Sequence, residues 1–211
     1  PAWMERSMLL TAYRIGFGTL TLVAVVTQAA ELAGREVLVP INFLSYFTIQ
    51  SNLIAVVVFF LGATRWRKAV SSTWDLVRGA STLNMTVTFV VFALLLSGTN
   101  VDTAIPWVNT VVHTVMPLAV IADWLIDPPR HSIALRTSLI WLVFPLAWTA
   151  YTLVRGAIAG WYPYPFLDPA NGGYPTVALY VVAILVFGVV LCAVISSVGN
   201  RLGEGRRHSA I

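Results

Sequence analysis

The chain has 211 residues, of which 58% are hydrophobic and only 10% are charged, and its formal net charge is +4. Together with a mean hydropathy of +0.80, this composition excludes a soluble globular domain and indicates an integral membrane protein. Several apolar runs approach the roughly 20 residues that a helix needs to cross a hydrocarbon core, and they lack the alternation of membrane β-strands. We therefore predict an all-α fold, a single transmembrane domain over residues 1–211.

Six apolar segments are predicted to span the membrane. Residues 1–7 precede them as an unstructured lead in which Met4 is a candidate native start, and Arg14 is expected to snorkel to the near interface. Pro145 interrupts the fifth segment. The predicted spans cover about residues 8–30, 42–63, 79–97, 107–126, 134–154 and 175–198, and a basic tail follows at residues 199–211.

The distribution of basic residues predicts the orientation of these spans. Six crossings place both termini on one side of the membrane, and Arg35 and Arg155 on the other. All the other basic residues lie on the side of the termini: Arg6, Arg14, Arg65, Arg67, Lys68, Arg78, Arg130, Arg136, Arg201, Arg206 and Arg207. By the positive-inside rule both termini are cytoplasmic. These residues lie in short segments and form no domain-sized basic face, so we expect no nucleic-acid partner.

The longest connection, residues 155–174, is rich in prolines and aromatic residues. Proline fixes φ and aromatic side chains suit a membrane interface, so this connection is predicted to be an ordered cap. The sequence leaves open whether residues 156–174 close over a site as a lid. Residues from the outer connections that are candidates to approach such a site are Asp102, Tyr162 and Asp168.

Polar side chains interrupt the start of the second predicted span at Thr48, Gln50, Ser51 and Asn52. Polar groups at membrane depth are costly unless the protein satisfies them. One interpretation is that they only hold helices together, at about 0.6–2 kcal/mol for each interhelical hydrogen bond. The other is that they face a functional site.

His113 is the only histidine inside a predicted span. At 1.5 Å per residue it lies roughly 9 Å below Trp107, and Thr48 lies roughly 8 Å below the start of its own helix, so the two share a depth. Asn109, one turn earlier, is expected to orient the imidazole. Pro117 has no N–H for the His113 carbonyl, which favours a kinked or opened turn. The alternative is a histidine satisfied within the core.

Cofactor chemistry is not expected. The only cysteine, Cys192, lies in an apolar run, which excludes an intrachain disulfide and makes a cysteine-based metal cluster implausible. A haem or metal held by paired histidines is disfavoured because His131 and His208 lie outside the spans. A retinal-type Schiff base is excluded because the only lysine, Lys68, lies in a connection.

Two short motifs resemble a known family. They are Tyr46-Phe47-Thr48 followed by Asn52, and Asn109-Thr110-Val111-Val112-His113-Thr114 followed by Pro117 and an acid at Asp123. The chain thereby resembles the androgen-induced and ADTRP-type family of multi-span membrane hydrolases. The resemblance implies a threonine nucleophile and a histidine that act on fatty-acid esters of hydroxy fatty acids, by position Thr48 and His113. Eukaryotic members have glutamate where this chain has Asp123, so a role for Asp123 does not carry over.

Two further stretches, residues 123–129 and 161–168, resemble a bacterial group of six-span proteins. This resemblance implies a bacterial plasma membrane. In the predicted topology the second and fourth spans both enter from the extracytoplasmic face, so the site is expected toward that side. Asp123 lies about 15 Å along its helix from His113, so we expect it to pair with a loop arginine or to serve the cytoplasmic interface.

The leading hypothesis is a membrane-embedded hydrolase of lipid esters. An aliphatic hydroxyl is a poor nucleophile until a base removes its proton, and histidine is the usual base. Thr48 would attack the ester carbonyl, while His113 accepts the proton and returns it to the leaving alcohol. Candidate supporting or substrate-binding residues are Asn52 and Asn109, for orienting or oxyanion roles, and Ser51, Gln50, Tyr162 and Asp168.

Two other functions are open at this point. A small transporter or lipid-binding bundle would use the same polar residues to line a path, although the spans show no internal repeat. A structural or assembly role is the third. Membrane lipids are partners in every case, and the oligomeric state is left open.

Overall fold

Helices form all the regular structure in the computed structural model, which describes residues 2–64, 71–97 and 105–208. Five helical segments are long and apolar enough to cross a membrane: Ser7–Gly34, Ser72–Leu96, Pro106–Ile126, Leu135–Ala159 and Gly173–Gly205. The predicted class, an all-α integral membrane protein, is confirmed by these segments.

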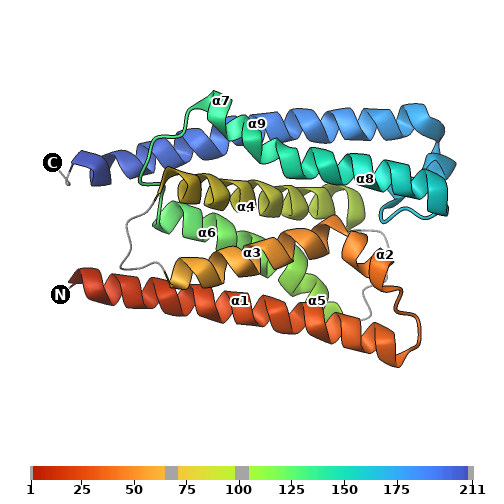
Figure 1. Cartoon of the computed structure of the whole chain (residues 1–211), viewed down its shortest axis with the longest axis horizontal. Helices are drawn as coiled ribbons and strands as arrows, with labels where there is room; N and C mark the ends of the chain where they lie inside the picture. The colour runs from red at the N-terminus through yellow and green to blue at the C-terminus, as the bar shows by residue number, and fades with distance from the viewer. Residues whose placement is uncertain (1, 65–70, 98–104, 209–211) are drawn as a thin grey trace.

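The helices lie side by side along the long axis of the molecule (Figure 1). Among the described residues the α-helices are α1 (Ala2–Gly34), α2 (Pro40–Ser45), α3 (Phe47–Ala63), α4 (Ser72–Val91), α5 (Pro106–Thr110), α6 (Met116–Ile126), α7 (Leu135–Ser138), α8 (Val143–Ala159) and α9 (Gly173–His208). In Figure 1, α1 lies along one side of the bundle and α8 and α9 along the opposite side. Helix α4 contacts α3, α6 and α9, so it is central to the packing.

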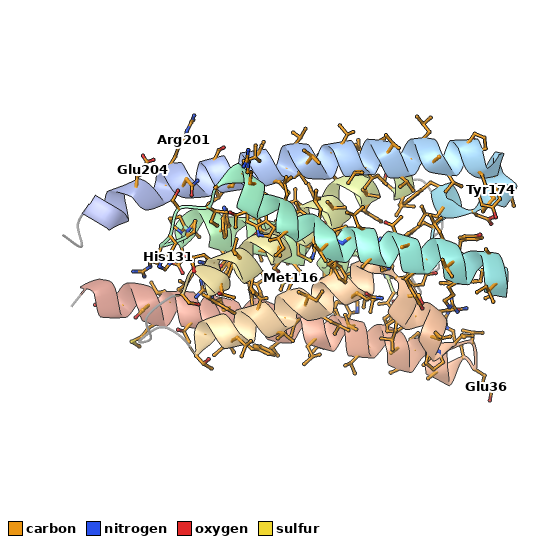
Figure 2. The ribbon with its side chains drawn as sticks, turned by 45° about the horizontal axis from the view of Figure 1, so that its top comes forward. Glu36, Met116, His131, Tyr174, Arg201 and Glu204 are labelled. Atoms are coloured by element: carbon orange, nitrogen blue, oxygen red, sulfur yellow. The ribbon has the colours of Figure 1, made fainter. Side chains whose placement is uncertain are left out.

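The two ends of the bundle are easily distinguished (Figures 1 and 2). Helix α1 starts and helix α9 ends at the same end of the bundle. In Figure 2, His131 and Glu204 also lie at this end, Glu36 and Tyr174 lie at the other, and Met116 lies between them.

Helical structure extends past the predicted spans at both ends of the chain. Helix α1 begins at Ala2, so the prediction of an unstructured lead was wrong for residues 2–7. Helix α9 continues to His208, so the predicted tail is helical up to that residue. Neither extension contains a proline that would stop the helix, and polar residues continue a helix readily outside the hydrocarbon core.

The second predicted span, residues 42–63, is divided. Tyr46 has an extended backbone, with φ −66° and ψ 129°, and separates α2 from α3. Helix α3 has 17 residues and is therefore about 25 Å long, less than the roughly 30 Å of a hydrocarbon core. The break places the first turn of α3, with Phe47 and Thr48 buried, inside the protein.

The fifth predicted span is irregular but not broken. It consists of α7, a 3-10 turn at Leu139–Leu142, and α8. Pro145 lies in the first turn of α8, where a missing N–H is tolerated, and the irregular turn directly precedes that helix.

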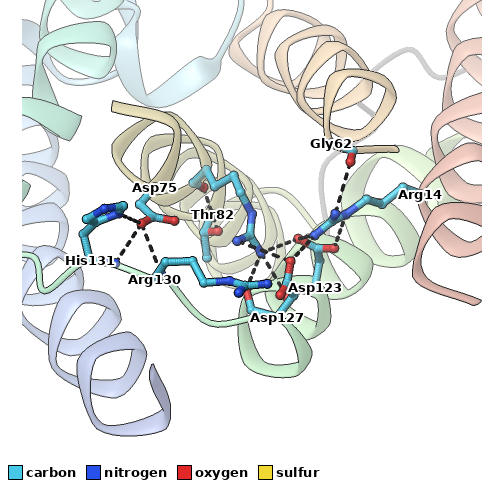
Figure 3. A network of polar contacts seen from close by, with 9 residues as sticks. Arg14, Gly62, Asp75, Thr82, Asp123, Asp127, Arg130 and His131 are labelled. Atoms are coloured by element: carbon cyan, nitrogen blue, oxygen red, sulfur yellow. Dashed lines mark hydrogen bonds and ion pairs between the residues drawn. The ribbon is translucent and has the colours of Figure 1, made fainter. Parts of the chain in front are cut away.

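A buried ion-pair network joins α1, α4 and α6 (Figure 3). Arg14 Nε donates to Asp123 Oδ1 at 2.7 Å, and Arg78 Nη2 donates to Asp123 Oδ2 at 2.8 Å. Arg14 Nη2 also donates to Asp127 Oδ2 at 2.8 Å. Arg14 is only 7% exposed, so the expectation that it snorkels to the interface was wrong, because two carboxylates replace its water. The expected pairing of Asp123 with an arginine is confirmed, although Arg78 belongs to a helix and not to a loop.

Substituting the central carboxylate tests the energetic weight of this network. We expect Asp123→Asn to lower the free energy of unfolding by about 3–5 kcal/mol, because two buried guanidinium groups then share only the Asp127 carboxylate. The measurement is the thermal unfolding midpoint of the purified protein in detergent. As a control, Glu31→Gln removes an exposed ion pair with Arg35 and should cost less than about 1 kcal/mol. Equal midpoints for the two variants would contradict a stabilising role for the network.

Candidate active site

The structure brings together the hydroxyl and the imidazole that the sequence singled out. Thr48 Oγ1 lies 3.2 Å from His113 Nε2, although the two residues are 65 positions apart. Their exposed fractions are 7% and 5%, so both side chains are largely shielded from bulk water. The predicted common depth of the two side chains is confirmed by this contact, while their role in catalysis stays a prediction.

The position of Thr48 follows from the break at Tyr46. Thr48 is the second residue of α3, and the side chain of Tyr46 does not cap this helix. First-turn amides of a helix have no partner within the helix, and the helix dipole gives this end a partial positive charge. Thr48 therefore has its hydroxyl and its own N–H at a helix terminus that favours negative charge.

The position of His113 depends on a widened turn. Residues Val111–Val115 form a π-helical turn, which Met116 N–H closes by donating to the Val111 carbonyl. Pro117 supplies no N–H to the His113 carbonyl, so the opened turn expected before this proline is confirmed. Such turns are common at functional sites because they reorient side chains within a continuous helix.

A main-chain carbonyl fixes the tautomer of the imidazole. His113 Nδ1 lies 3.2 Å from the Asn109 carbonyl oxygen, which can only accept, so we assign the proton to Nδ1. The lone pair of Nε2 then faces Thr48, and the Thr48 hydroxyl donates to it. Asn109 orients the imidazole as expected, and it does so through its main-chain carbonyl.

Tyr164 is a site residue that sequence reasoning missed. Its Oη lies 3.2 Å from both Thr48 N and Thr48 Oγ1. Because Thr48 donates its own proton to His113, the hydroxyl of Tyr164 is the donor to Thr48 Oγ1, and its oxygen accepts from Thr48 N–H. Burial raises the pKa of Tyr164 to about 12, so the hydroxyl keeps its proton at neutral pH.

The two residues proposed from the same connection do not reach Thr48. Tyr162 packs against Gly156, where an added Cβ would overlap its ring. Asp168 accepts a hydrogen bond from Ala170 N and caps a short 3-10 turn. The prolines on either side of Tyr164 were the available signal, because Pro163 fixes its own φ and Pro165 restricts the backbone of Tyr164 before it. Asp102 lies outside the described residues.

Asn52 joins the two halves of the site. Its Nδ2 donates to the Thr48 carbonyl at 2.8 Å and to the Val112 carbonyl at 3.0 Å. Both amide protons are thereby used on main-chain carbonyls, so Asn52 holds α3 against the π-helical turn, while its suggested oxyanion role stays a prediction.

The two other polar residues at the start of α3 are Gln50 and Ser51, and neither contacts the imidazole of His113 through a hydrogen bond among the described residues. Gln50 Nε2 donates to the Leu44 carbonyl and bridges the bend between α2 and α3. Ser51 is fully buried, and its hydroxyl has no hydrogen-bond partner among the described residues.

An aromatic ring holds the imidazole on one face. Phe92 stacks on His113 with ring centroids 4.0 Å apart and an angle of 16° between the planes. Phe92 begins a second π-helical turn, Phe92–Leu96, at the end of α4. Sequence reasoning did not find it, since an apolar residue in an apolar span carries no signal of its own.

Two cavities meet at Thr48. The first, which we call the wide cavity, has a volume of about 650 Å³ and reaches both Thr48 and His113. Its wall includes the buried amide of Gln28, which has no hydrogen-bond partner among the described residues. The other residues around it are Leu32, Arg35, Val37, Leu38, Val39, Asn42, Phe43, Tyr46, Ile49, Val108, Val112, Trp161 and Tyr164.

The second cavity, which we call the narrow cavity, has a volume of about 80 Å³. Its wall is apolar and comes mainly from α4, α8 and α9: Leu83, Val87, Val91, Phe92, Leu96, Leu142, Pro145, Leu146, Trp148, Val181, Ile184, Leu185 and Gly188, with Phe47, Thr88, Thr149, Phe166 and Leu167. Among the described residues, only Thr48 and Tyr164 border both cavities.

Comparisons of the chain with protein-family models, with curated proteins and with solved structures found no significant match. The function is therefore inferred from the residues of the chain itself.

Removing the Asn52 amide tests how the two halves of the site are held together. We expect Asn52→Leu to lower the free energy of unfolding by about 1–3 kcal/mol, because two buried carbonyls lose their donor. Thermal unfolding in detergent measures the change. Thr64→Val is a suitable control, since it removes an exposed hydroxyl whose only described bond is to Leu61 O. If Asn52→Leu unfolded no earlier than this control, Asn52 would not hold α3 to the π-helical turn.

Proposed function

We propose that the chain is a membrane-embedded hydrolase of lipid esters, with Thr48 as nucleophile and His113 as general base. The observation that carries this proposal is the buried hydrogen bond between Thr48 Oγ1 and His113 Nε2 at a helix N-terminus beside a cavity of about 650 Å³. A hydroxyl becomes nucleophilic when a positioned base accepts its proton, and these two groups have that arrangement.

In this proposal the chain crosses the membrane six times, and α2 with α3 form the second crossing. By the positive-inside rule both termini then lie in the cytoplasm, and the bacterial setting follows the resemblance given above. The wide cavity includes residues from the α1–α2 connection, at the opposite end of the bundle, so its site would lie toward the extracytoplasmic side of the plasma membrane. An ester linkage just under the headgroups would reach this depth.

The first half of the reaction forms an acyl-enzyme. Thr48 Oγ1 forms a bond to the carbonyl carbon while its proton passes to His113 Nε2. The carbonyl π electrons move to the oxygen and return as the bond to the alcohol oxygen breaks. His113 then gives its proton to the departing alcohol, which leaves Thr48 acylated.

The second half restores the enzyme. Water gives a proton to His113 Nε2 and its oxygen bonds to the acyl carbon. When the bond from that carbon to Thr48 Oγ1 breaks, the proton returns to Oγ1 and the carboxylic acid is released.

Tyr164 is proposed to stabilise the developing oxyanion. In the resting site its hydroxyl donates to Thr48 Oγ1. After attack this oxygen is part of an ester-like linkage and is a weak acceptor, so the donor is available to the new oxyanion bonded to the same carbon. Thr48 N–H and the N-terminus of α3 favour negative charge at the same place.

A transporter or lipid-binding bundle is the alternative predicted from the sequence. Such a protein needs polar groups along a path but not a hydroxyl that donates to the free nitrogen of a histidine. The contact between Thr48 and His113 therefore favours the hydrolase.

Covalent labelling tests the nucleophile and the base. We expect an activated alkyl phosphonate to modify the purified wild-type protein and to leave Thr48→Ala and His113→Gln unmodified, as measured by intact mass. Thr86→Ala, which removes a part-buried hydroxyl that borders neither cavity, should be modified like wild type. Modification of Thr48→Ala at the wild-type rate would overturn the proposed nucleophile.

A second comparison tests the oxyanion donor. Tyr164→Phe keeps the ring and removes only the hydroxyl, so we expect ester hydrolysis to fall by about 10²-fold, as for loss of one oxyanion donor. Tyr162→Phe makes the same chemical change two residues away and should retain wild-type turnover. Equal turnover by both variants would remove Tyr164 from the mechanism.

A further inference from the structure

We propose that the two arms of the ester occupy different cavities: the acyl chain lies in the narrow cavity, and the leaving alcohol lies in the wide cavity. This assignment rests on the proposed hydrolase function and defines the orientation of the bound ester. It follows from three separate features of the described residues.

The first feature is that Thr48 borders both cavities. The carbonyl carbon must lie at Thr48 Oγ1 for attack, and an ester extends from that carbon in two directions. One arm can therefore enter each cavity while the reacting carbon lies at their junction, beside the hydroxyl of Tyr164.

The second feature is that His113 borders only the wide cavity. The protonated imidazole must reach the alcohol oxygen as its bond to carbon breaks, so the alcohol has to be on that side. Phe92, which stacks on His113, lines the narrow cavity instead, and the stacked rings thus stand between the two spaces. The same geometry lets water approach His113 through the wide cavity after the alcohol has left.

The third feature is the chemistry of the walls. Apart from Thr48 and Tyr164, the hydroxyls of the narrow cavity belong to Thr88 and Thr149, and both donate to carbonyls of their own helices. This leaves an apolar wall suited to a hydrocarbon chain. The wide cavity has the buried amide of Gln28, which is 5% exposed, has no partner within the described part of the chain and can donate to and accept from a polar group on the alcohol.

A bifunctional probe distinguishes the cavities directly. An alkyl phosphonate with a p-nitrophenol leaving group and a diazirine at the chain end bonds to Thr48 Oγ1 and releases p-nitrophenol, which takes the proton from His113. Irradiation then expels nitrogen, and the carbene inserts into the nearest residues. We expect mass spectrometry to place the cross-links within residues 142–149 and 181–188. Cross-links within residues 28–39 would overturn the assignment.

A filled narrow cavity gives a second readout. A Cβ at Gly188 would lie 2.9 Å from Leu142 Cδ2, so Gly188→Leu shortens the available space. We expect hydrolysis of hexanoyl esters, whose chain is on the scale of the narrow cavity, to fall by about tenfold or more relative to butanoyl esters of the same alcohol. The relative hydrolysis rates of butanoyl esters of different alcohols should not change.

The matched variant Val39→Trp narrows the wide cavity. It should change the relative hydrolysis rates of esters that differ in the alcohol, and leave those of esters that differ in the acyl group unchanged. The arm assignment would be overturned if Gly188→Leu changed the relative hydrolysis rates of esters that differ in the alcohol. It would also be overturned if the variant left the relative rates for different acyl groups unchanged. In both cases hydrolysis would still depend on Thr48. If Thr48→Ala were labelled and hydrolysed esters as wild type does, the proposed function would be overturned instead, and the assignment with it.

Discussion

Backbone hydrogen bonding is interrupted twice at the depth of the candidate site, and the groups that repair these interruptions also build the site. In a hydrocarbon environment each unsatisfied backbone group costs several kcal/mol. At the Tyr46 break, Tyr164 accepts from Thr48 N–H. At the π-helical turn, Asn52 Nδ2 donates to the Val112 carbonyl. The requirement to satisfy the backbone therefore brings a hydroxyl, an imidazole and a phenol within hydrogen-bonding distance.

The bundle is polar in two different ways at its two ends. Toward the start of α1, Arg14 and Arg78 are fully engaged with Asp123 and its neighbours, which fixes α1, α4 and α6 to one another. Toward the α1–α2 connection, polar side chains line a cavity. The ion pairs at one end thus fix the helices that carry the candidate site, and the cavity lies at the other end. Side chains are positioned most precisely on helices that are held rigidly.

The connection between α8 and α9 supplies a residue of the candidate site. Tyr164 belongs to this connection, and it borders both cavities. Displacement of the connection would therefore remove a donor from Thr48 and join the two cavities at the same time. The contact of Tyr164 with Thr48 thus depends on an ordered connection, and the prolines around Tyr164 restrict the backbone of that connection.

The sequence by itself determined the membrane class, the approximate positions of the five long apolar helices, the shared depth of Thr48 and His113, and the opened turn before Pro117, because hydropathy, helix rise and the missing N–H of proline are local properties. It could not determine that α2 and α3 separate at Tyr46, that Arg14 is buried, or that Tyr164 and not Tyr162 reaches Thr48. Those outcomes depend on partners supplied by distant segments: Asp123 for Arg14, and the first turn of α3 for Tyr164. Only tertiary packing decides which of several similar polar side chains meets another, since each pairing replaces water that the isolated segment would have kept.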